Sequence, residues 1–382
     1  MSTADVRLGD CRQVLRELAD ASVDAVVTDP PYEIGFMGRG WDASGIAYDG
    51  AVWREVLRVL KPGGHLLAFG ASRTFHRVAV AIEDAGFELR DVIAWIRGGP
   101  TMPKGLDVSK AIDKAAGARG HEGRNMRTDG GVGTTTFFAT VRPAEYTRPP
   151  AVTDEAKTWL GWHTALKPVL EPIVVARKPL DGTVVENVLE HGVGAYNVDG
   201  CRIGTEKRVN PPAKNKPGKG STDIMRGAQS TRGLEVDPSV AVGRWPPNAI
   251  FSHLPTCGRL ECDDGCPVPE LELQRAPVGA FPAFRYQPKA SRDDRGPGNV
   301  HPTVKPVELI RWCVRLVTPK GGVVVDPFTG SGTTGVACVL ERARFIGAEL
   351  SPEYRKIALD RINRAQRSVA GEQLELFEGM TL

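Results

Sequence analysis

The segment VVVDPFTGSGTTGVACVL, residues 323–340, constrains the fold of this chain more than any other. Its three valines are typical of a short buried strand, and the residues from Thr333 onward are typical of a helix. Between them, Gly330, Gly332 and Gly335 allow a tight turn that brings main-chain N–H groups close to a ligand. A strand, a glycine turn and a helix in this order predict an α/β sheet that binds a nucleotide-like cofactor. A glycine turn with a purely structural role is the alternative.

Strands and helices alternate in two blocks on either side of a long irregular centre. The first block is expected to contain strands at 5–11, 23–29, 65–70 and 88–96, helices at 11–21, 51–60 and 74–85, and a KPGG turn at 61–64. A further strand is expected within 170–179. The second block is expected to contain helices at 304–317, 333–342 and 352–366 and strands at 322–328 and 344–350. This pattern predicts an α/β fold with a doubly wound, mostly parallel, Rossmann-like sheet.

The residues around the glycine turn indicate which cofactor it binds. Glu349 ends the next strand, 19 residues after Gly330, where an acid can accept hydrogen bonds from ribose hydroxyls. Asp326 stands directly before the turn, and its negative charge would repel a pyrophosphate. No Gly-Lys-Ser/Thr follows, so a phosphate-binding loop of the ATP type is not supported. S-adenosylmethionine, which carries cationic amino and sulfonium groups, fits the turn best.

A second predicted strand ends in a carboxylate, in the sequence AVVTDPPYEIG at residues 25–35. The exocyclic amine of adenine or cytosine is a weak nucleophile because its lone pair is delocalised into the ring. The Asp29 carboxylate and the Pro30 carbonyl can each accept one amine hydrogen, which turns the lone pair toward a methyl donor. The two prolines hold these acceptors in place, and Tyr32 can stack on a base flipped out of the duplex. A capped turn without catalysis is the structural alternative.

In the order of these motifs the chain resembles the DNA amino-methyltransferases of the β class, over residues 5–113, 159–178 and 283–366. In that family the DPPY motif comes first, a target-recognition region follows, and the cofactor turn, here DPFTGSGTT, comes last. The resemblance implies direct methyl transfer from S-adenosylmethionine to a flipped base in double-stranded DNA. It leaves the recognised DNA sequence open.

The resemblance also implies roles for individual residues. The implied catalytic residues are Asp29, Pro30, Pro31 and Tyr32. The implied cofactor-binding residues are Asp10, His301, Lys305, Asp326, Pro327, Phe328, Gly330, Ser331, Gly332, Thr333 and Glu349. An aspartate at the start of the tetrad favours adenine N6 as the methyl acceptor, with cytosine N4 as the alternative. Two more distant alternatives are a NAD-dependent oxidoreductase and a non-catalytic DNA-binding protein. The first explains the glycine turn but not the DPPY motif, and the second also leaves the DPPY motif without a role.

Six regions are expected from the positions of the motifs. They are a catalytic half at 1–113, a flexible insertion at 114–158, a strand region at 159–180, a target-recognition region at 181–298, a half that binds S-adenosylmethionine at 299–370, and a tail at 371–382.

A cluster of soft metal ligands lies within the predicted target-recognition region. His253, Cys257, Cys262 and Cys266 occupy fourteen residues, enough for a tetrahedral zinc site. Because their spacing is not the paired CxxC of strong zinc signatures, unpaired thiols and a local disulfide are the alternatives. Structural zinc would stabilise a loop-rich module that has no large core of its own.

Composition indicates an ordinary globular protein. Net charge is only +3, but residues 202–232 contain eight Lys or Arg against two acids. This basic segment is either a solvated loop or a contact to DNA phosphates. The chain shows no signal peptide and no apolar run long enough for a membrane span. We therefore expect a cytoplasmic protein of a bacterial or phage-host cell, associated with the nucleoid and not with a membrane.

The last residues contain a possible docking peptide. Gln373, Leu374, Leu376 and Phe377 resemble the short motif with which many bacterial proteins bind the DNA sliding clamp. Packing of these apolar side chains on the protein's own surface is the alternative. A homodimer is a further arrangement that the sequence leaves open.

Overall fold

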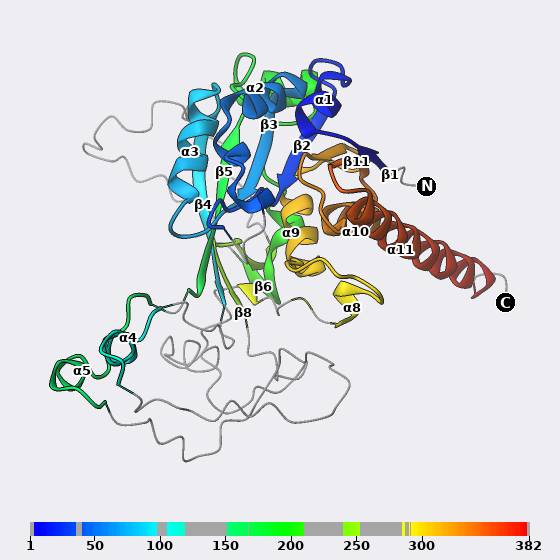
Figure 1. Cartoon of the computed structure of the whole chain (residues 1–382). Helices are drawn as coiled ribbons and strands as arrows, with labels where there is room; N and C mark the ends of the chain where they lie inside the picture. Colours follow the sequence, from blue (N-terminus) through cyan, green and yellow to red (C-terminus); the bar gives the residue numbers. More distant parts are fainter. Residues whose placement is uncertain are drawn as a thin grey trace, which may run out of the picture. The chain divides into compact units, whose positions relative to one another are not determined.

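The computed structural model describes residues 4–35, 40–97, 105–118, 151–166, 168–209, 240–252, 285–286, 290 and 292–379. Its main feature is a nine-stranded sheet with the strand order β1-β11-β10-β2-β3-β5-β4-β8-β9 (Figure 1). These strands are β1 (Ala4–Leu8), β2 (Val23–Thr28), β3 (Leu60–Phe69), β4 (Glu88–Arg97), β5 (Leu170–Arg177), β8 (Ala249–Ser252), β9 (Arg285–Tyr286), β10 (Val323–Asp326) and β11 (Arg344–Glu349). Strands β6 (Ile203–Val209) and β7 (Val240–Arg244) form a separate antiparallel pair.

The large sheet is mostly parallel, as predicted. Strands β1, β11, β10, β2 and β3 run in one direction. Strand β5 runs antiparallel to both of its neighbours, β3 and β4, and β8 and β9 continue in parallel beyond β4. Because Ile96 near the end of β4 faces Leu170 at the start of β5, the chain leaves and re-enters the sheet at the carboxyl edge of the parallel strands.

Helices cover both faces of the sheet, which makes it doubly wound (Figure 1). Along β2, Ala25 and Val27 pack into the core formed with α9 (Val307–Val317), α10 (Thr333–Leu340) and α11 (Pro352–Gly379). Val26, between them, packs into the core formed with α1 (Cys11–Arg16), α2 (Gly50–Val59) and α3 (Phe75–Asp84). A strand buried on both sides has no solvent-exposed polar face, which explains the consecutive apolar residues Ala25–Val27 of β2 and Val323–Val325 of β10.

Helix α6 (Val184–His191) lies in a stretch for which no regular structure was predicted. It follows Thr183, whose hydroxyl accepts from the Glu186 main-chain N–H while the Glu186 carboxylate accepts from the Thr183 N–H. This capping box is visible in the sequence as T-x-x-E and would have located the helix start. The short helices are α4 (Val108–Ala115), α5 (Asp154–Thr158), α8 (Arg292–Arg295) and the 3-10 helices η2 (Gly40–Ala43), η3 (Ile46–Tyr48) and η4 (Asp199–Cys201).

Two boundaries in the first block differ from the prediction. Strand β3 begins at Leu60 and includes the KPGG sequence that was expected to form a turn. Gly63 takes a φ of 76° there, and the pairing with β2 shifts register, so the chain passes through an irregularity without leaving the sheet. Helix α1 ends at Arg16, earlier than the expected 11–21.

Two boundaries in the second block also differ. Helix α9 begins at Val307 and not at 304, because Pro306 disfavours helical backbone at the residue before it. Helix α11 continues to Gly379, beyond the expected end at 366, because no proline interrupts it. It therefore includes part of the region that was assigned to a tail.

Residues Pro100–Val169 form a compact unit separate from the unit that contains the sheet. Within it, the buried Asp113 carboxylate of α4 accepts from the main-chain N–H groups of Val152 and Thr153 and from the Thr153 hydroxyl. Thr153 in turn caps α5. These bonds join α4 to α5 inside the unit.

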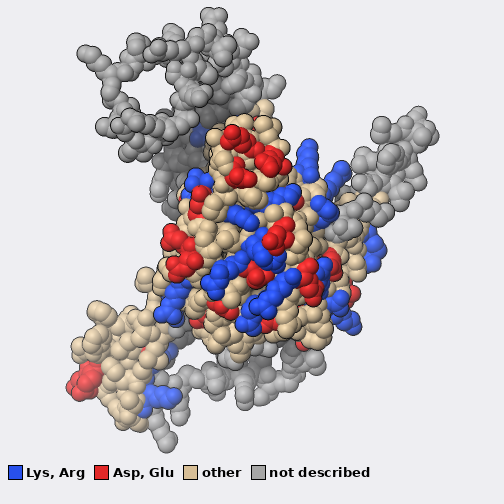
Figure 2. Space-filling model, turned by 90° about the horizontal axis from the view of Figure 1, so that it is seen from above, with Lys and Arg blue, Asp and Glu red and all other residues tan. Residues whose placement is uncertain are grey.

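The described surface is that of an ordinary globular protein. On the face shown in Figure 2, basic and acidic side chains are interleaved, as is typical of a solvated surface. No helix in the described ranges is both long and apolar enough to cross a membrane. The cysteines of the described part, Cys11, Cys201, Cys313 and Cys338, are buried thiols.

Candidate active site

The two sequence motifs end neighbouring strands, although 298 residues separate Thr28 from Asp326. Strand β2 pairs in parallel with β10, with Ala25 opposite Val324. The Thr28 hydroxyl donates to Asp326 Oδ1 at 2.6 Å. Both motifs therefore lie at the carboxyl edge of the sheet, where open α/β sheets bind ligands, and form one site.

Asp29 has one engaged carboxylate oxygen and one available oxygen. Its Oδ2 accepts from Lys305 Nζ at 2.6 Å. Its Oδ1 is buried and has no hydrogen-bond partner within the described ranges, and none is found there for the Pro30 carbonyl. The Asp29 side chain is 28% exposed, so part of it remains accessible to a ligand. Burial raises the pKa of Asp29, and the Lys305 ammonium opposes that rise.

The turn that carries Asp29 is held by side chains that the sequence did not reveal. The buried Asp42 carboxylate accepts from the main-chain N–H groups of Tyr32 and Glu33 at 2.8 and 3.1 Å. The Thr74 hydroxyl donates to the Tyr32 carbonyl at 2.8 Å. Glu33 adopts a left-handed φ of 54°, and its carboxylate accepts from the Gly45 N–H at 2.8 Å. A non-glycine residue persists in this conformation only where its surroundings determine it, so the turn is rigid.

Four charged side chains, Asp29, Arg97, Glu171 and Lys305, form a cluster beside Tyr32. Glu171, on β5, is 8% exposed. Its Oε2 accepts from the Tyr32 hydroxyl at 3.0 Å and lies 3.6 Å from Lys305 Nζ, while its Oε1 lies 3.0 Å from Arg97 Nη1. Lys305 Nζ also lies 5.0 Å from the centroid of the Tyr32 ring. Lys305 was predicted to bind the cofactor and Asp29 to be catalytic; in the structure the Lys305 ammonium contacts the Asp29 carboxylate. Two carboxylates and two cations balance one another here.

The glycine turn has a backbone that only glycine fits well. Gly332 has a φ of 81°, and a Cβ there would lie 2.8 Å from Cα and Cβ of Ala358 on α11. Gly330 has a φ of 52°, and a Cβ there would lie 3.1 Å from His301 Nε2. The Gly330 N–H donates to Glu349 Oε2 at 2.8 Å. The turn thus joins the end of β10 to the end of β11.

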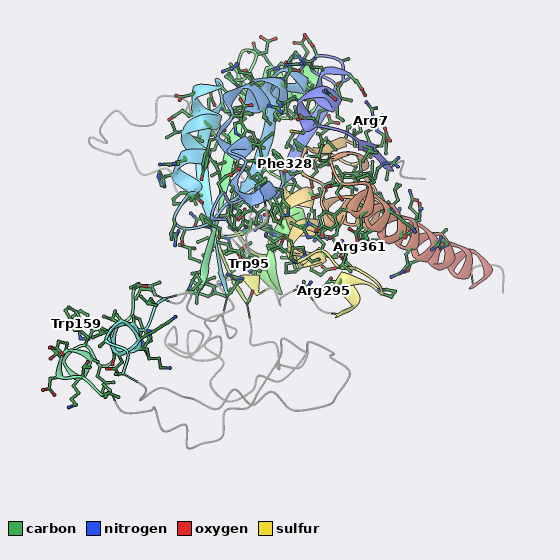
Figure 3. The ribbon with its side chains drawn as sticks, in the orientation of Figure 1. Arg7, Trp95, Trp159, Arg295, Phe328 and Arg361 are labelled. Carbon is green, nitrogen blue, oxygen red and sulfur yellow. The ribbon has the colours of Figure 1, made fainter. Side chains whose placement is uncertain are left out.

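A buried arginine of α11 supports the same turn from beneath. Arg361 Nη1 donates to the Ser331 carbonyl, to the Ser331 hydroxyl at 3.0 Å and to the Thr333 hydroxyl at 3.1 Å, and Nη2 donates to the Asp294 carbonyl. Figure 3 marks its place on the ribbon. Burial lowers the pKa of Arg361 to about 10, so it remains a cation at neutral pH. Its position 28 residues after Thr333 gave no sequence signal.

The three predicted cofactor carboxylates differ in their surroundings. Asp326 is 2% exposed, accepts from the Phe328 N–H at 3.0 Å, and has its pKa raised to about 6 by burial. Glu349 Oε1 accepts from the Ser351 N–H at 2.8 Å, and burial raises the pKa of Glu349. Asp10 caps α1, and its hydrogen bonds with Arg12 lower the pKa of Asp10.

His301 lies between two aromatic rings beside the glycine turn. Its ring meets Tyr354 edge-on at 4.5 Å and lies parallel to Trp41 at 6.3 Å between centroids. Burial lowers the pKa of His301 to about 4, and its Nδ1 is 2.6 Å from the Thr303 carbonyl. The ring is therefore neutral at pH 7, with the proton assigned to Nδ1.

The chemistry of this edge fits S-adenosylmethionine. Asp326 ends β10, Glu349 ends the adjacent strand β11, and Asp10 follows β1, which pairs with β11. Leu8 faces Glu349, and the Gly9 N–H donates to the Glu349 carbonyl at 3.0 Å, so the three carboxylates belong to the same edge of the sheet. Acceptors of this kind suit ribose hydroxyls and a cationic sulfonium better than a pyrophosphate.

Several predicted features fall outside what the structure describes. They are the zinc ligands His253, Cys257, Cys262 and Cys266, the side chains of Gln373, Leu374, Leu376 and Phe377, and most of the basic segment 202–232. These features remain predictions.

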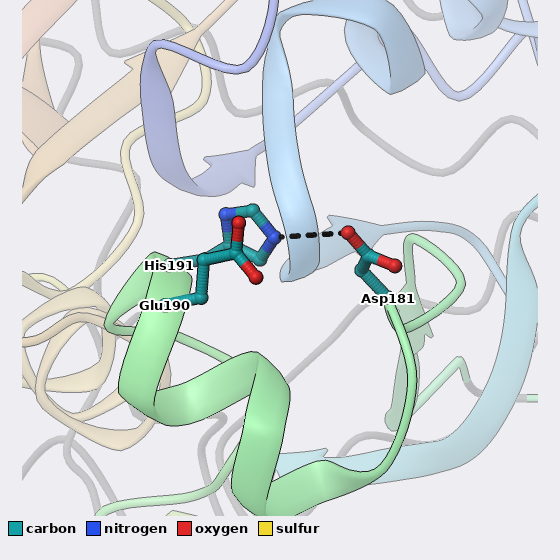
Figure 4. Close-up of side chains that lie close together, drawn as sticks. All are labelled: Asp181, Glu190 and His191. Carbon is teal, nitrogen blue, oxygen red and sulfur yellow. Dashed lines mark ion pairs between the residues drawn. The ribbon is translucent and has the colours of Figure 1, made fainter.

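Within the described ranges, a different set of side chains could hold a metal ion. Ligand atoms of Asp181, Glu190 and His191 lie within 4.8 Å of one another (Figure 4). Both acids are exposed, and His191 Nε2 is 3.6 Å from Asp181 Oδ2. His191 stands in the last turn of α6, where a positive charge is favoured by the helix dipole. We interpret the group as a surface ion pair.

Comparison with known proteins gives a consistent result. The model of a DNA methylase family, the N6/N4 methyltransferases, matches residues 23–360. M.HindIII, a type II methyltransferase of Haemophilus influenzae, is 22% identical over 311 residues, which cover 81% of this chain and 66% of that protein. The type II methyltransferase M.XycI of Xanthomonas campestris pv. cyanopsidis is 45% identical over 69 residues, 18% of this chain and 23% of that protein.

A third relative is the DNA adenine methyltransferase YhdJ of Escherichia coli, 39% identical over 72 residues, which cover 19% of this chain and 24% of YhdJ. The chain therefore spans about a quarter of the length of two of these relatives and just under two thirds of the other.

Proposed function

The chain belongs to the N6/N4 DNA methylase family, and we propose that it transfers a methyl group from S-adenosylmethionine to the exocyclic amine of a flipped base in double-stranded DNA. Adenine N6 is the favoured acceptor because aspartate opens the DPPY tetrad, and cytosine N4 is the alternative. The observation that supports the proposal most strongly is the buried, unpartnered Oδ1 of Asp29, one residue from the Pro30 carbonyl.

These two oxygens match the needs of an exocyclic amine. The amine presents two hydrogens, and when both are accepted its lone pair leaves the plane of the ring and becomes nucleophilic. Lys305 fixes the other oxygen of Asp29, and Asp42 fixes the turn, so the acceptors need little reorganisation when the base arrives. Bound S-adenosylmethionine supplies an electrophilic methyl group on a sulfonium, whose C–S bond breaks as the N–C bond forms.

Proton balance assigns Asp29 a second task. The methylated amine carries one hydrogen more than the product, and Asp29 is the carboxylate placed to accept it. Burial favours this step because it raises the pKa of Asp29 above its ordinary value. The Asp29 side chain is 28% exposed, and the proton then passes from it to solvent.

Tyr32 is the proposed stacking platform for the flipped base. Its hydroxyl donates to Glu171, and burial raises the pKa of Tyr32 well above its usual value, so the ring stays neutral and fixed. Stacking of one base on an aromatic ring contributes roughly 1–3 kcal/mol. That is enough to offset much of the cost of unstacking the base from the duplex.

The remaining assignments are proposals that follow from the family. Residues of the glycine turn, with Glu349, Asp10 and His301, are proposed to hold the cofactor. Residues 181–298 are proposed to read the DNA sequence, with zinc bound by the cysteine cluster. Residues 373–377 are proposed to bind the sliding clamp.

The test is methyl incorporation by the purified protein. DNA is incubated with S-adenosylmethionine labelled in the methyl group, digested to nucleosides and analysed by mass spectrometry. We expect label in N6-methyladenine, and label in N4-methylcytosine would select the alternative acceptor. Asp29→Ala is expected to lower the rate at least about 100-fold.

Asp20→Ala is the matched control, because Asp20 is 78% exposed and pairs only with Arg58. It is expected to keep the wild-type rate. The proposed mechanism would be refuted if neither nucleoside carried label, or if the Asp29→Ala variant were as active as the wild type.

A further inference from the structure

The position of Lys305 poses an electrostatic problem for the proposed reaction. Its ammonium lies 2.6 Å from Asp29 Oδ2, and its side chain is only 10% exposed. A cation so close to Asp29 weakens the negative charge that attracts the amine hydrogens. It also repels the positive charge that develops on the amine nitrogen during methyl transfer. An uncompensated lysine would therefore slow the step that Asp29 promotes.

Glu171 supplies the compensating charge. Its Oε2 lies 3.6 Å from Lys305 Nζ, and both side chains are 10% exposed, so solvent screens their attraction weakly. The same oxygen accepts from the Tyr32 hydroxyl at 3.0 Å. One carboxylate thus contacts both the cation beside Asp29 and the ring proposed to carry the base.

The charges around Asp29 come from several elements. Lys305 precedes α9, Glu171 lies on β5, Arg97 ends β4 and Asp326 ends β10, while Tyr32 is a neutral phenol. Arg97 Nη1 lies 3.0 Å from Glu171 Oε1, whereas Lys305 Nζ is near the other oxygen, Oε2. Glu171 is therefore the carboxylate that stands between the two cations.

We propose that Glu171 is a positioning residue for methyl transfer, which holds Lys305 and offsets its positive charge so that the Asp29 carboxylate remains a strong acceptor of the amine hydrogens. This inference rests on the proposed function and concerns the same site. Glu171 acts through Lys305 and does not touch the reacting atoms.

The decisive variant is Glu171→Gln, which keeps the shape of the side chain and an acceptor for the Tyr32 hydroxyl but removes the charge. We expect the single-turnover rate of methyl transfer to fall about 10- to 100-fold, with Kd values for S-adenosylmethionine and DNA within about twofold of wild type. Because Glu171 raises the pKa of Asp29, the acidic limb of the pH–rate profile should move to lower pH in the variant. A purely structural role would not move that limb.

Four further variants complete the experiment. Glu341→Gln is the matched control, since Glu341 is 14% exposed and pairs with Arg311 and Arg315 between α9 and α10. It is expected to keep the wild-type rate and profile. Glu171→Asp keeps the charge and should retain more of the rate than Glu171→Gln, with an unmoved acidic limb. The double variant Glu171→Gln/Lys305→Met should be no slower than Lys305→Met alone, because the two residues act as a unit.

The possible outcomes separate this inference from the proposed function. If the wild-type protein does not methylate DNA, the proposed function itself fails. If the wild type is active and Glu171→Gln has its rate and pH profile, only the role of Glu171 is refuted. Equal losses in the Gln and Asp variants, or additive losses in the double variant, also refute it. Thermal unfolding of each variant shows that the comparison is made on folded protein.

Discussion

Arg361→Met tests whether the glycine turn depends on the arginine beneath it. The substitution keeps an unbranched apolar stem, because methionine fills the space of the arginine methylenes. It removes every hydrogen bond from Arg361 to the Ser331 and Asp294 carbonyls and to the hydroxyls of Ser331 and Thr333. The hydroxyls can rotate to other partners, but the two carbonyls lose a charged donor.

Two opposing magnitudes determine the expected stability of this variant. A hydrogen bond from a charged donor contributes about 1.5–3 kcal/mol, so two carbonyls lose roughly 3–6 kcal/mol. Burial, however, lowers the pKa of Arg361 to about 10, and removal of this desolvated cation regains about 3 kcal/mol. The free energy of unfolding should therefore fall by only about 0–3 kcal/mol.

The affinity for the cofactor should change more clearly than stability. Ser331 and Thr333 flank Gly332, and without Arg361 the turn loses its support from α11. We expect Kd for S-adenosylmethionine to rise at least about tenfold, which corresponds to 1.4 kcal/mol. Isothermal titration calorimetry and urea unfolding measure the two quantities, with Arg367→Met, an exposed arginine of the same helix, as control. A variant that loses stability but binds the cofactor as tightly as the wild type would refute the supporting role.

Three further predictions concern stability. Gly332→Ala should lower the free energy of unfolding by roughly 2–4 kcal/mol in urea, because φ is 81° and the new Cβ would lie 2.8 Å from Ala358; Gly45→Ala, with a φ of 77° and no atom within 4 Å of its Cβ, should lose only about 1 kcal/mol. Burial raises the pKa of Asp326 from 3.8 to about 6, so the native state binds more protons than the unfolded state between these pH values, and stability falls as pH rises through them. In urea unfolding, Asp326→Asn should raise the free energy of unfolding by up to about 3 kcal/mol at pH 7.5 and leave it unchanged at pH 3.5. Burial lowers the pKa of His65 from 6.5 to about 4, so the stability that neutral His65 contributes is lost as pH falls from 6.5 to 4. The free energy of unfolding of His65→Leu should therefore depend less on pH over that range, and a pH dependence equal to that of the wild type would contradict the shift.

Much of the fold was predictable because it follows from local patterns. The apolar runs at β2 and β10 predicted buried parallel strands, and the motif-bearing turns were placed correctly after them. The failures occurred where a local signal had to be weighed against long-range pairing. KPGG has strong turn chemistry, yet Leu60 before it and His65 after it both pair with β2, so it forms an irregularity within β3, and this pairing is invisible in the sequence.

The DPPY motif was recognisable in the sequence, but the side chains that support its turn were not. Asp29, Pro30 and Tyr32 form a contiguous motif, and their chemistry can be read from the residue types. Asp42 and Arg361 act through main-chain groups of the two turns. Any loop aspartate or helix arginine can do so, and only the folded chain shows which one does. Sequence spacing carries no information about such contacts unless they lie within a few residues.

Glu171 shows why a rule for finding active sites in parallel sheets overlooks some residues. That rule directs attention to the carboxyl ends of strands, where Asp29, Asp326 and Glu349 were found. Strand β5 runs antiparallel to its neighbours, so its first residues, and not its last, lie at the same edge. An acid at the second position of a strand whose centre is apolar, in LEPIVVAR, was therefore the available signal. A charge in such a strand must be paired to be buried, and its partners here are Lys305 and Arg97. An antiparallel strand in a mostly parallel sheet should accordingly be searched from its amino end.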